Sequence, residues 1–404
     1  MTTPAREVVA GVDTHADTHH AAVIDAVGRR LGDAQFPATA AGYAALAAFL
    51  LSFGIVLRVG VEGTGSYGAG LSRHLRSLGM LVAEVIRPNR QLRRLQGKTD
   101  PIDAYAAART ALAEMDLPTP KTADGTVEAI RHLLVARRSA VKSRTAAIAQ
   151  IKALLVTAPE QTRAKFRGLS DDKLIDTLAR SRPSSSEAVA SAAGHALRSL
   201  ARRHQHLGEE ITDLEALLAP LVKAANPALV AAFGINTVTA AQLLVTAGDN
   251  PERLHSEASF AALCGTSPIS ASSGKTTRHR LNRGGDRQAN TALHRIALTR
   301  MSHDRRTRDY IAGLTARGKG KKEAMRCLKR AIAREVFTHL TNPAEIPTID
   351  DLRPYDRHEA SPSPPSPRTS ASGPTRSPQS NAAPAATTTS PTPTGNGSTP
   401  LDRT

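Results

Sequence analysis

Apolar and polar positions in the first 115 residues alternate between strand-like and helix-like patterns. Short runs typical of buried strands occur at 8–12, 21–25, 30–36, 55–61 and 81–86. Helical spacing occurs at 40–51, at 66–78 up to Gly79, and at 102–113 after Pro101. This order predicts an antiparallel meander of three strands, to which two later strands add in parallel through helical crossovers.

From residue 126 to 225 the pattern becomes wholly helical. Apolar residues recur three, four and seven positions apart, at Ile130, Leu133, Leu134, Val141, Ile148, Ile151, Leu154 and Leu155. A second helix is predicted near 205–224, and the polar stretch 180–186 predicts a loop between the two helices. We expect this region to be a helical, coiled-coil spacer that can dimerise.

The chain has 404 residues, which is longer than a chain that folds around a single hydrophobic core usually is. The predicted class is α/β plus all-α: an α/β domain over 1–125, the spacer over 126–225 and a mainly helical domain over 226–340. Positions 361–400 hold 10 Pro, 9 Ser and 8 Thr and no Val, Ile, Leu, Met or aromatic residue. Such a composition cannot offset the entropy of ordering, so residues 341–404 are predicted to be a disordered tail.

Charge and composition favour a nucleic-acid partner. Lys and Arg number 53 against 36 Asp and Glu, and residues 272–334 alone hold 18 basic and 4 acidic residues. Aromatic residues make up 3% of the chain, which argues against stacking platforms for single strands. Apolar runs are too short to span a membrane, and the N-terminus shows no signal pattern, so a cytoplasmic protein is expected. Cys264 and Cys327 are too far apart for a zinc cluster or a disulfide framework.

Four acids of the first domain are candidates for a metal site. Asp13 ends the first strand and Glu62 ends the fourth, so neighbouring strands would bring them to one sheet edge. Asp100 and Asp103 are three residues apart at the start of a helix, hence on one face. Single acids are usually just exposed, but four together are typical ligands of Mg²⁺. Two such ions about 3.5–4 Å apart can clamp the attacking and leaving oxygens of a phosphodiester.

Other polar residues close by are less suited to bind Mg²⁺. Asp17 and Asp25 are nearby acids, but they are weaker candidates for ligands than the four acids above. His15, His19 and His20 resemble a metal cluster, but strand alternation separates His19 from His20, and Mg²⁺ prefers oxygen ligands. We therefore expect no histidine ligand.

A basic segment directly precedes the acid pair. It contains Arg87, Arg90, Arg93, Arg94 and Lys98. Charge runs are often only solvated loops, but this one leads straight into Asp100, so contacts with phosphates near the scissile bond are predicted.

Ser272 and Ser273 lie in a small-residue loop with basic residues after it. A serine against a cationic surface can attack a phosphodiester and form a phosphoserine, with arginine stabilising the added charge. A plain serine-rich turn is the commoner explanation, and spacing does not choose between the two serines. The predicted nucleic-acid contacts here are Lys275, Arg278, Arg280, Arg283 and Arg287.

Three segments, 11–13, 61–65 and 98–104, resemble the motifs of the DEDD transposases of bacterial insertion sequences (insertion sequence 110/116/902 type). The stretches 268–274 and 283–287 resemble that family's C-terminal transposase domain. The resemblance implies a RuvC-like RNase H fold with Asp13, Glu62, Asp100 and Asp103 as metal ligands, and a nucleophilic serine at Ser272 or Ser273. It also implies a bridge RNA that specifies donor and target DNA. Finally, it implies a tetramer built from dimers, whose active sites combine the acid domain of one subunit with the serine domain of another.

Two further segments of the C-terminal region predict contacts with nucleic acid. Residues 233–240 resemble the Gly-Ile-Gly turn by which helical hairpins hold a DNA backbone, with Gly234 as the contact. Asn236 replaces the second glycine and is expected to tolerate the left-handed conformation. Residues 319–336 predict a helix with two faces. Its apolar face would be Met325, Cys327, Leu328, Ile332 and Val336, and its basic face would carry Lys319, Lys321, Lys322, Arg326, Lys329, Arg330 and Arg334.

The sequence therefore favours a transposase or recombinase that cuts and rejoins DNA. A site-specific DNA invertase would share the architecture. A Mg²⁺-dependent junction nuclease would need the four acids but use water in place of a serine. A nucleic-acid-binding remnant without catalysis would need neither.

Overall fold

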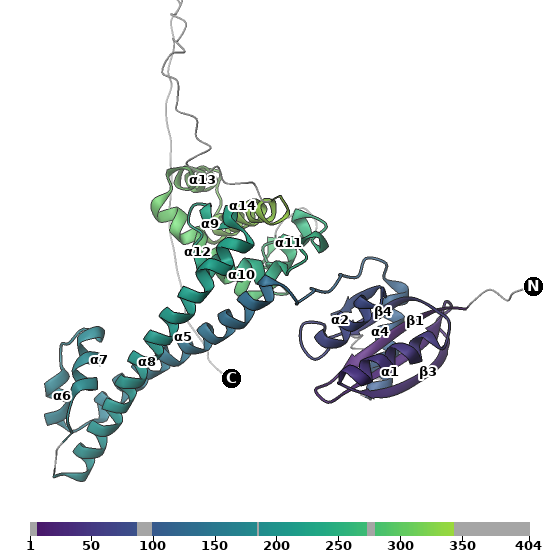
Figure 1. The fold of residues 1–404 in the computed structure, drawn as a ribbon. Coiled ribbons are helices and arrows are strands. Elements are labelled where there is room, and N and C mark those ends of the chain that lie inside the picture. Colours follow the sequence, from purple (N-terminus) through teal and green to yellow (C-terminus); the bar gives the residue numbers. More distant parts are fainter. Residues whose placement is uncertain (1–5, 87–98, 184–185, 273–278, 343–404) are drawn as a thin grey trace, which may run out of the picture. The chain divides into compact units, whose positions relative to one another are not determined.

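A computed structural model describes residues 6–86, 99–183, 186–272 and 279–342 (Figure 1). The first of these ranges forms a five-stranded sheet in the order β3-β2-β1-β4-β5. The strands are β1 (Glu7–Thr14), β2 (Thr18–Asp25), β3 (Arg30–Pro37), β4 (Ile55–Glu62) and β5 (Val82–Val85). Strands β1, β2 and β3 pair antiparallel, while β4 joins β1, and β5 joins β4, in parallel. The predicted meander with two added parallel strands is confirmed.

Helices cover both faces of this sheet, because side chains alternate along each strand. Helices α1 (Ala40–Leu51) and α2 (Ala69–Ser77) pack on one face, where Leu46, Leu50 and Leu71 meet residues such as Val8 and Val12. Helix α4 (Asp100–Ala113) packs on the other face against Val9 and Ile24. Most of the buried side chains of α4 are alanines, which lets the helix lie close to the strands.

Two long helices follow, α5 (Thr126–Thr157) and α8 (Ala188–Ala225), and they pack against each other. Between them lie α6 (Glu160–Phe166) and α7 (Asp171–Arg180), which the sequence did not predict. Helix α8 starts well before the predicted residue 205, because its first half buries Leu197 and Ala201 against Leu174 and Leu178 of α7. The predicted loop begins after Arg180, although residues 184–185 lie outside the described part.

The remaining described residues are mainly helical. They form α9 (Pro227–Ala231), α10 (Thr237–Ala247), a short 3₁₀ helix (Pro251–Arg253), α11 (Glu257–Leu263), the hairpin β6 (Ile269–Ser270) and β7 (His279–Arg280), α12 (Arg287–His303), α13 (Arg305–Ala316) and α14 (Lys321–Thr341). Their core surrounds Phe260, Leu293 and Ile332, and it includes Ile130 of α5 and Leu218 of α8. The predicted boundary at residue 225 thus runs through a shared core.

These elements confirm the broad prediction of an α/β sheet region followed by a mainly helical region. Within the described ranges, no helix combines the length and the apolar character that crossing a bilayer requires. The predicted tail, residues 343–404, lies outside the described part of the chain.

Candidate functional site

The four predicted acids are carried by three elements that meet at one edge of the sheet. Asp13 lies near the end of β1, and the parallel register pairs Val12 with Val61, so Glu62 follows on the adjacent strand. The Thr14 hydroxyl donates to the backbone carbonyl of Glu62 over 2.8 Å, which ties the two strand ends together. Asp100 and Asp103 occupy the first turn of α4.

Glycine in the strands brings α4 close enough for its acids to reach this edge. A Cβ on Gly11 would lie 2.1 Å from the Ala108 nitrogen and 2.3 Å from the Ala104 carbonyl oxygen. A Cβ on Gly60 of β4 would lie 2.8 Å from the Ala107 carbonyl oxygen. No side chain fits in these gaps, so the helix backbone rests directly on the strands.

The acids act on one another electrostatically. Asp13 is only 6% exposed and Asp103 only 1%. Burial raises the pKa of the Asp13 carboxyl; His15 opposes this, whereas the charges of Asp103 and Asp100 add to it. Three of the predicted acids are thus close enough to interact, and the strand register places Glu62 beside Asp13.

His15 lies between two of the carboxylates. Its Nε2 atom is 3.2 Å from Asp13 Oδ2 and 3.3 Å from Asp100 Oδ1. Neither His15 Nε2 nor Asp13 Oδ2 has a hydrogen-bond partner among the described residues. One ligand atom each from Asp13, His15 and Asp100 lies within 4.8 Å of the others. Two carboxylate oxygens and an imidazole nitrogen that converge in this way, with a buried oxygen lacking a partner, fit a divalent cation.

His15 is therefore a candidate ligand in addition to the four predicted acids. The available signal was its position, because His15 directly follows β1 and is two residues after Asp13. The other two histidines serve packing instead. His19 is fully buried and stacks on Tyr43 with ring centroids 5.5 Å apart, and His20 Nε2 lies 2.8 Å from Asp33 Oδ2.

Asp17 and Asp25, the two weaker candidates, lie away from this cluster of ligand atoms. Asp25 accepts hydrogen bonds from the backbone of Val27 and Arg29 in the turn after β2, and Asp17 is exposed. The basic residues predicted to contact phosphate before Asp100, namely Arg87, Arg90, Arg93, Arg94 and Lys98, lie outside the described residues.

Ser272 follows a short hairpin in the C-terminal region. Ile269 pairs with Arg280 and Ser270 with His279, and Ser272 Oγ lies 3.3 Å from Ser270 Oγ. Ser273, Lys275 and Arg278 fall in 273–278, outside the described residues, so the two serines stay equal candidates. Arg280 is exposed on β7.

The segment 283–287 packs against the end of α11, where the Asp286 backbone N–H donates to the Leu263 carbonyl. Asp286 caps α12 by accepting from the backbone of Gln288 and Ala289, and its Oδ2 accepts from the Thr246 hydroxyl over 2.8 Å. A Cβ on Gly285 would lie 2.3 Å from the Gly265 nitrogen, so only glycine permits this close approach. Arg283 and Arg287 flank this packed turn, at its first residue and at the start of α12.

The turn at 233–236 departs from its prediction. Gly234 adopts the left-handed conformation, with φ +77°. Asn236 does not: its φ is −97° and its side chain caps α10 by accepting from the Thr239 backbone N–H. Asparagine is used here as a helix cap, so the expectation of a left-handed Asn236 was wrong. Arg300 Nε donates to the Phe233 carbonyl over 2.8 Å and holds the turn against α12.

Two family models, both of insertion-sequence transposases, match this chain. Residues 10–158 match a family model described as "Transposase", of the DEDD type of IS110. Residues 227–312 match "Transposase IS116/IS110/IS902 family". The two models together cover more than half of the chain, which therefore belongs to this transposase family. The resemblance seen in the sequence is confirmed.

A particular relative comes from Streptomyces coelicolor. It is described as "Insertion element IS110 uncharacterized 43.6 kDa protein", and it is 33% identical over 145 residues. The match covers 35% of this chain and 36% of the relative, so the chain spans about a third of the length of the curated protein it matches.

Proposed function

We propose that this chain cuts DNA strands and joins them to new partners. Asp13, Glu62, Asp100 and Asp103 would hold Mg²⁺, and Ser272 or Ser273 would be the nucleophile. The observation that carries the proposal is that ligand atoms of Asp13 at the end of β1, His15 and Asp100 on α4 lie within 4.8 Å of one another. The strand register supports a place for Glu62 beside them. Family membership supplies the reaction class.

The acids and the serine would have separate tasks. Bound Mg²⁺ supplies positive charge that stabilises the phosphate as it becomes more negative. The carboxylates fix the position of that charge, and His15 orients Asp13 and Asp100 by its contact with both. The serine Oγ attacks phosphorus and loses its proton to solvent, while the bond to the leaving strand oxygen breaks and that oxygen takes up a proton. A hydroxyl of a second strand then attacks the phosphoserine, and the serine is released.

We further propose a bridge RNA that selects donor and target DNA, and a tetramer built from dimers with active sites shared between subunits. Family membership supports both features. The concentration of basic residues after position 272 supports contact with more than one nucleic-acid strand.

A recombination assay in cells tests the reaction. Donor and target plasmids are supplied with the noncoding DNA that flanks the element, and joined product is measured by sequencing across the junction. Asp13→Asn and the double change Ser272→Ala/Ser273→Ala are each expected to abolish product. Matched controls are Asp17→Asn, an exposed acid near the site, and Ser302→Ala, an exposed serine on α12.

The single serine changes then identify the nucleophile, and labelled DNA attached to the denatured protein reveals the phosphoserine. Product that survives loss of both serines would refute the covalent step and favour the junction nuclease. Product that survives Asp13→Asn would refute the role of the acids. Product confined to fixed inverted sites would favour the invertase.

A further inference from the structure

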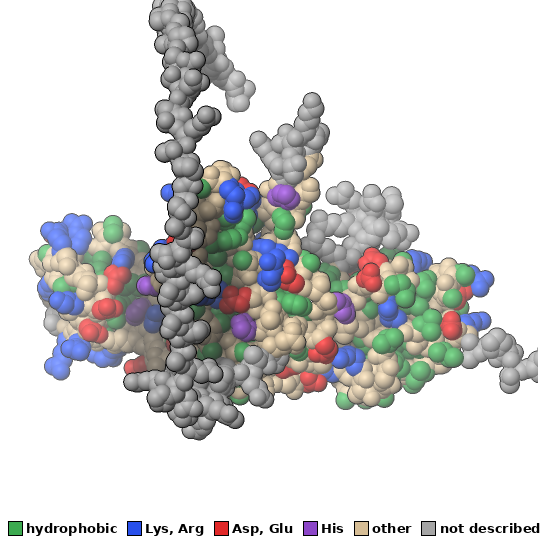
Figure 2. All heavy atoms as spheres, turned by 90° about the horizontal axis from the view of Figure 1, so that it is seen from above, with side chains coloured by type: hydrophobic (Ala, Val, Ile, Leu, Met, Phe, Trp, Pro, Cys, Tyr) green, Lys and Arg blue, Asp and Glu red, His purple; other side chains and the backbone are tan. Residues whose placement is uncertain are grey.

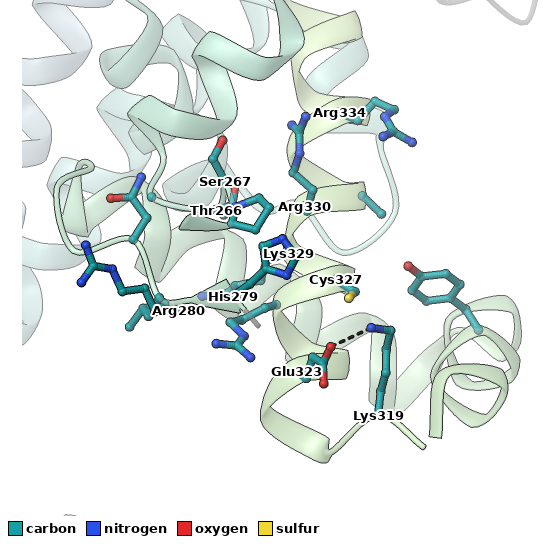
Figure 3. A pocket seen from close by; sticks show the side chains of 17 residues that line it. Thr266, Ser267, His279, Arg280, Lys319, Glu323, Cys327, Lys329, Arg330 and Arg334 are labelled. Atoms are coloured by element: carbon teal, nitrogen blue, oxygen red, sulfur yellow. Dashed lines mark hydrogen bonds and ion pairs between the residues drawn. The ribbon is translucent and has the colours of Figure 1, made fainter. Parts of the chain in front are cut away.

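A pocket of about 650 Å³ lies between α14, the segment after α11 and the hairpin of β6 and β7 (Figure 3). Thr266 and Ser267 lie on one side of it, and Arg330 and Arg334 project from α14 on another. Six lysine or arginine side chains line it: Arg280, Lys319, Arg326, Lys329, Arg330 and Arg334. Other basic side chains gather at the left of Figure 2, over α6 and α7.

Three of these cations form ion pairs with two carboxylates. Lys319 Nζ lies 2.6 Å from Glu323 Oε1, the contact dashed in Figure 3. Arg330 and Arg334 both pair with Glu257, Arg334 over 2.7 Å. The other three, Arg280, Arg326 and Lys329, have no carboxylate within 4.0 Å among the residues that the structure describes. The pocket therefore carries an excess of positive charge.

Lys329 is the cation that most needs an anion. It is only 8% exposed, and its Nζ donates to Asn290 Oδ1 over 2.8 Å. The Asn290 amide nitrogen donates to the carbonyls of Cys264 and Gly265, so its oxygen is fixed toward the lysine. An amide oxygen carries no net charge, and a buried ammonium without a counter-ion is costly. Burial lowers the pKa of Lys329, and the charge of Arg326 lowers it further.

The position of the pocket indicates which anion fits. His279 and Arg280 of β7 line it, and β7 pairs with β6 at Ser270, two residues before Ser272. The pocket is thus at the base of the hairpin that carries the candidate serines. We propose that it binds a backbone phosphate of a nucleic-acid strand, with Lys329 and Arg326 as its ligands, and so positions that strand beside the serine hairpin. The inference rests on the proposed function for the meaning of the hairpin, but phosphate binding itself needs no catalysis.

Equilibrium binding by the full chain tests the inference. The probes are a 40-base-pair DNA duplex and a single-stranded RNA of the same length, each titrated over a range of KCl concentrations. Lys329→Met and Arg326→Gln are each expected to weaken binding of at least one probe about tenfold. The slope of log K against log salt should also become shallower by about 0.7–0.9. The control, Lys322→Met, removes an exposed lysine of the same helix that does not line the pocket, and should change the affinity less than twofold.

The two probes separate the sources of the phosphate. A loss with DNA alone assigns the pocket to the DNA strand, a loss with RNA alone assigns it to the RNA, and either supports the inference. Unchanged binding of both probes by Lys329→Met and Arg326→Gln would overturn it. Equal weakening by Lys322→Met would also overturn it, because the effect would then be one of general surface charge.

Cys327 gives an independent readout in the unaltered protein, because its side chain lines the pocket. A strand bound there is expected to slow maleimide labelling of Cys327 at least fivefold in wild type and much less in Arg326→Gln. This holds even if Lys329→Met fails to fold. Unchanged labelling under saturating DNA and under saturating RNA would refute the inference. Neither measurement requires strand cleavage, so a failed recombination assay would refute the proposed function and leave this result standing.

Discussion

Gly11 is the position at which a single methyl group should disturb both the fold and the metal site. Replacing Gly11 with alanine puts a Cβ 2.1 Å from the Ala108 nitrogen, where ordinary contact begins at 3.4 Å. Helix α4 must therefore move away from β1 by roughly 1.3 Å, the difference between these distances. Backbone atoms block the methyl group, so no flexible side chain can rotate aside to make room.

Two costs follow from this displacement. Overpacking of a core typically costs about 1–3 kcal/mol. The displacement also opens a gap of about 1 Å between the rest of α4 and the sheet, and such a gap loses up to about half of the dispersion energy of the contacts that it separates. We expect about 3 kcal/mol in total, which is roughly a hundredfold in the opening equilibrium. Asp100 moves with the helix, and the shift far exceeds the roughly 0.2 Å within which metal–ligand distances are held.

Hydrogen–deuterium exchange of the full chain measures the local stability. Peptides from α4 and β1 are expected to exchange about a hundredfold faster in Gly11→Ala, and Mn²⁺ affinity measured by calorimetry should fall at least tenfold. Gly60→Ala, with its nearest contact at 2.8 Å, should show a smaller effect, and Gly65→Ala, with no atom within 4 Å, none. Wild-type exchange in Gly11→Ala, or equal effects in all three variants, would refute the reasoning.

Three further predictions concern single side chains. Asn236→Ala should lower the free energy of unfolding in urea by about 1–2 kcal/mol, whereas Asn236→Asp should retain the cap; equal losses would exclude capping as the role. Burial raises the pKa of Cys264 to about 12, so at pH 8 the native chain should react with Ellman's reagent at Cys327 only, and at both thiols in urea. Because the pKa of Asp13 is raised in the fold, its ionisation opposes folding, and stability is lost as pH rises from 3.8 through the raised value. Metal-free Asp13→Asn should therefore resist urea better than wild type at pH 7, yet lose the stabilisation by Mn²⁺ that Asp17→Asn keeps.

The sheet was predictable because strand patterns are local. Alternating apolar and polar residues predict the strands, and short turns and right-handed crossover connections determine their order. The positions of the acids, at the strand ends and in the first turn of α4, follow from that order. Helices α6 and α7 were missed because they are short and depend on burial against α8. The prediction that Lys329 belongs to the basic face of its helix was wrong, because it is buried with Leu328 and Ile332. Lys329 is four residues before the buried Ala333 and seven before the buried Val336, a spacing that already pointed to the buried face. Its partner Asn290 was not, because 39 residues separate the two.

The shared core of the C-terminal region has a consequence for how the chain is made. Ile130 and Leu134 of α5 lie in the same core as Val336 and Leu340 of α14, more than two hundred positions later. During translation, the core-forming residues of α5 and α8, such as Ile130 and Leu218, leave the ribosome before residues 227–340 have been made to cover them. At about 5–20 residues per second, this interval lasts roughly ten seconds. A chain truncated anywhere in it would present uncovered apolar surface to chaperones and proteases. Shortened copies of the gene should therefore yield little protein, even when every residue of the acid site is intact.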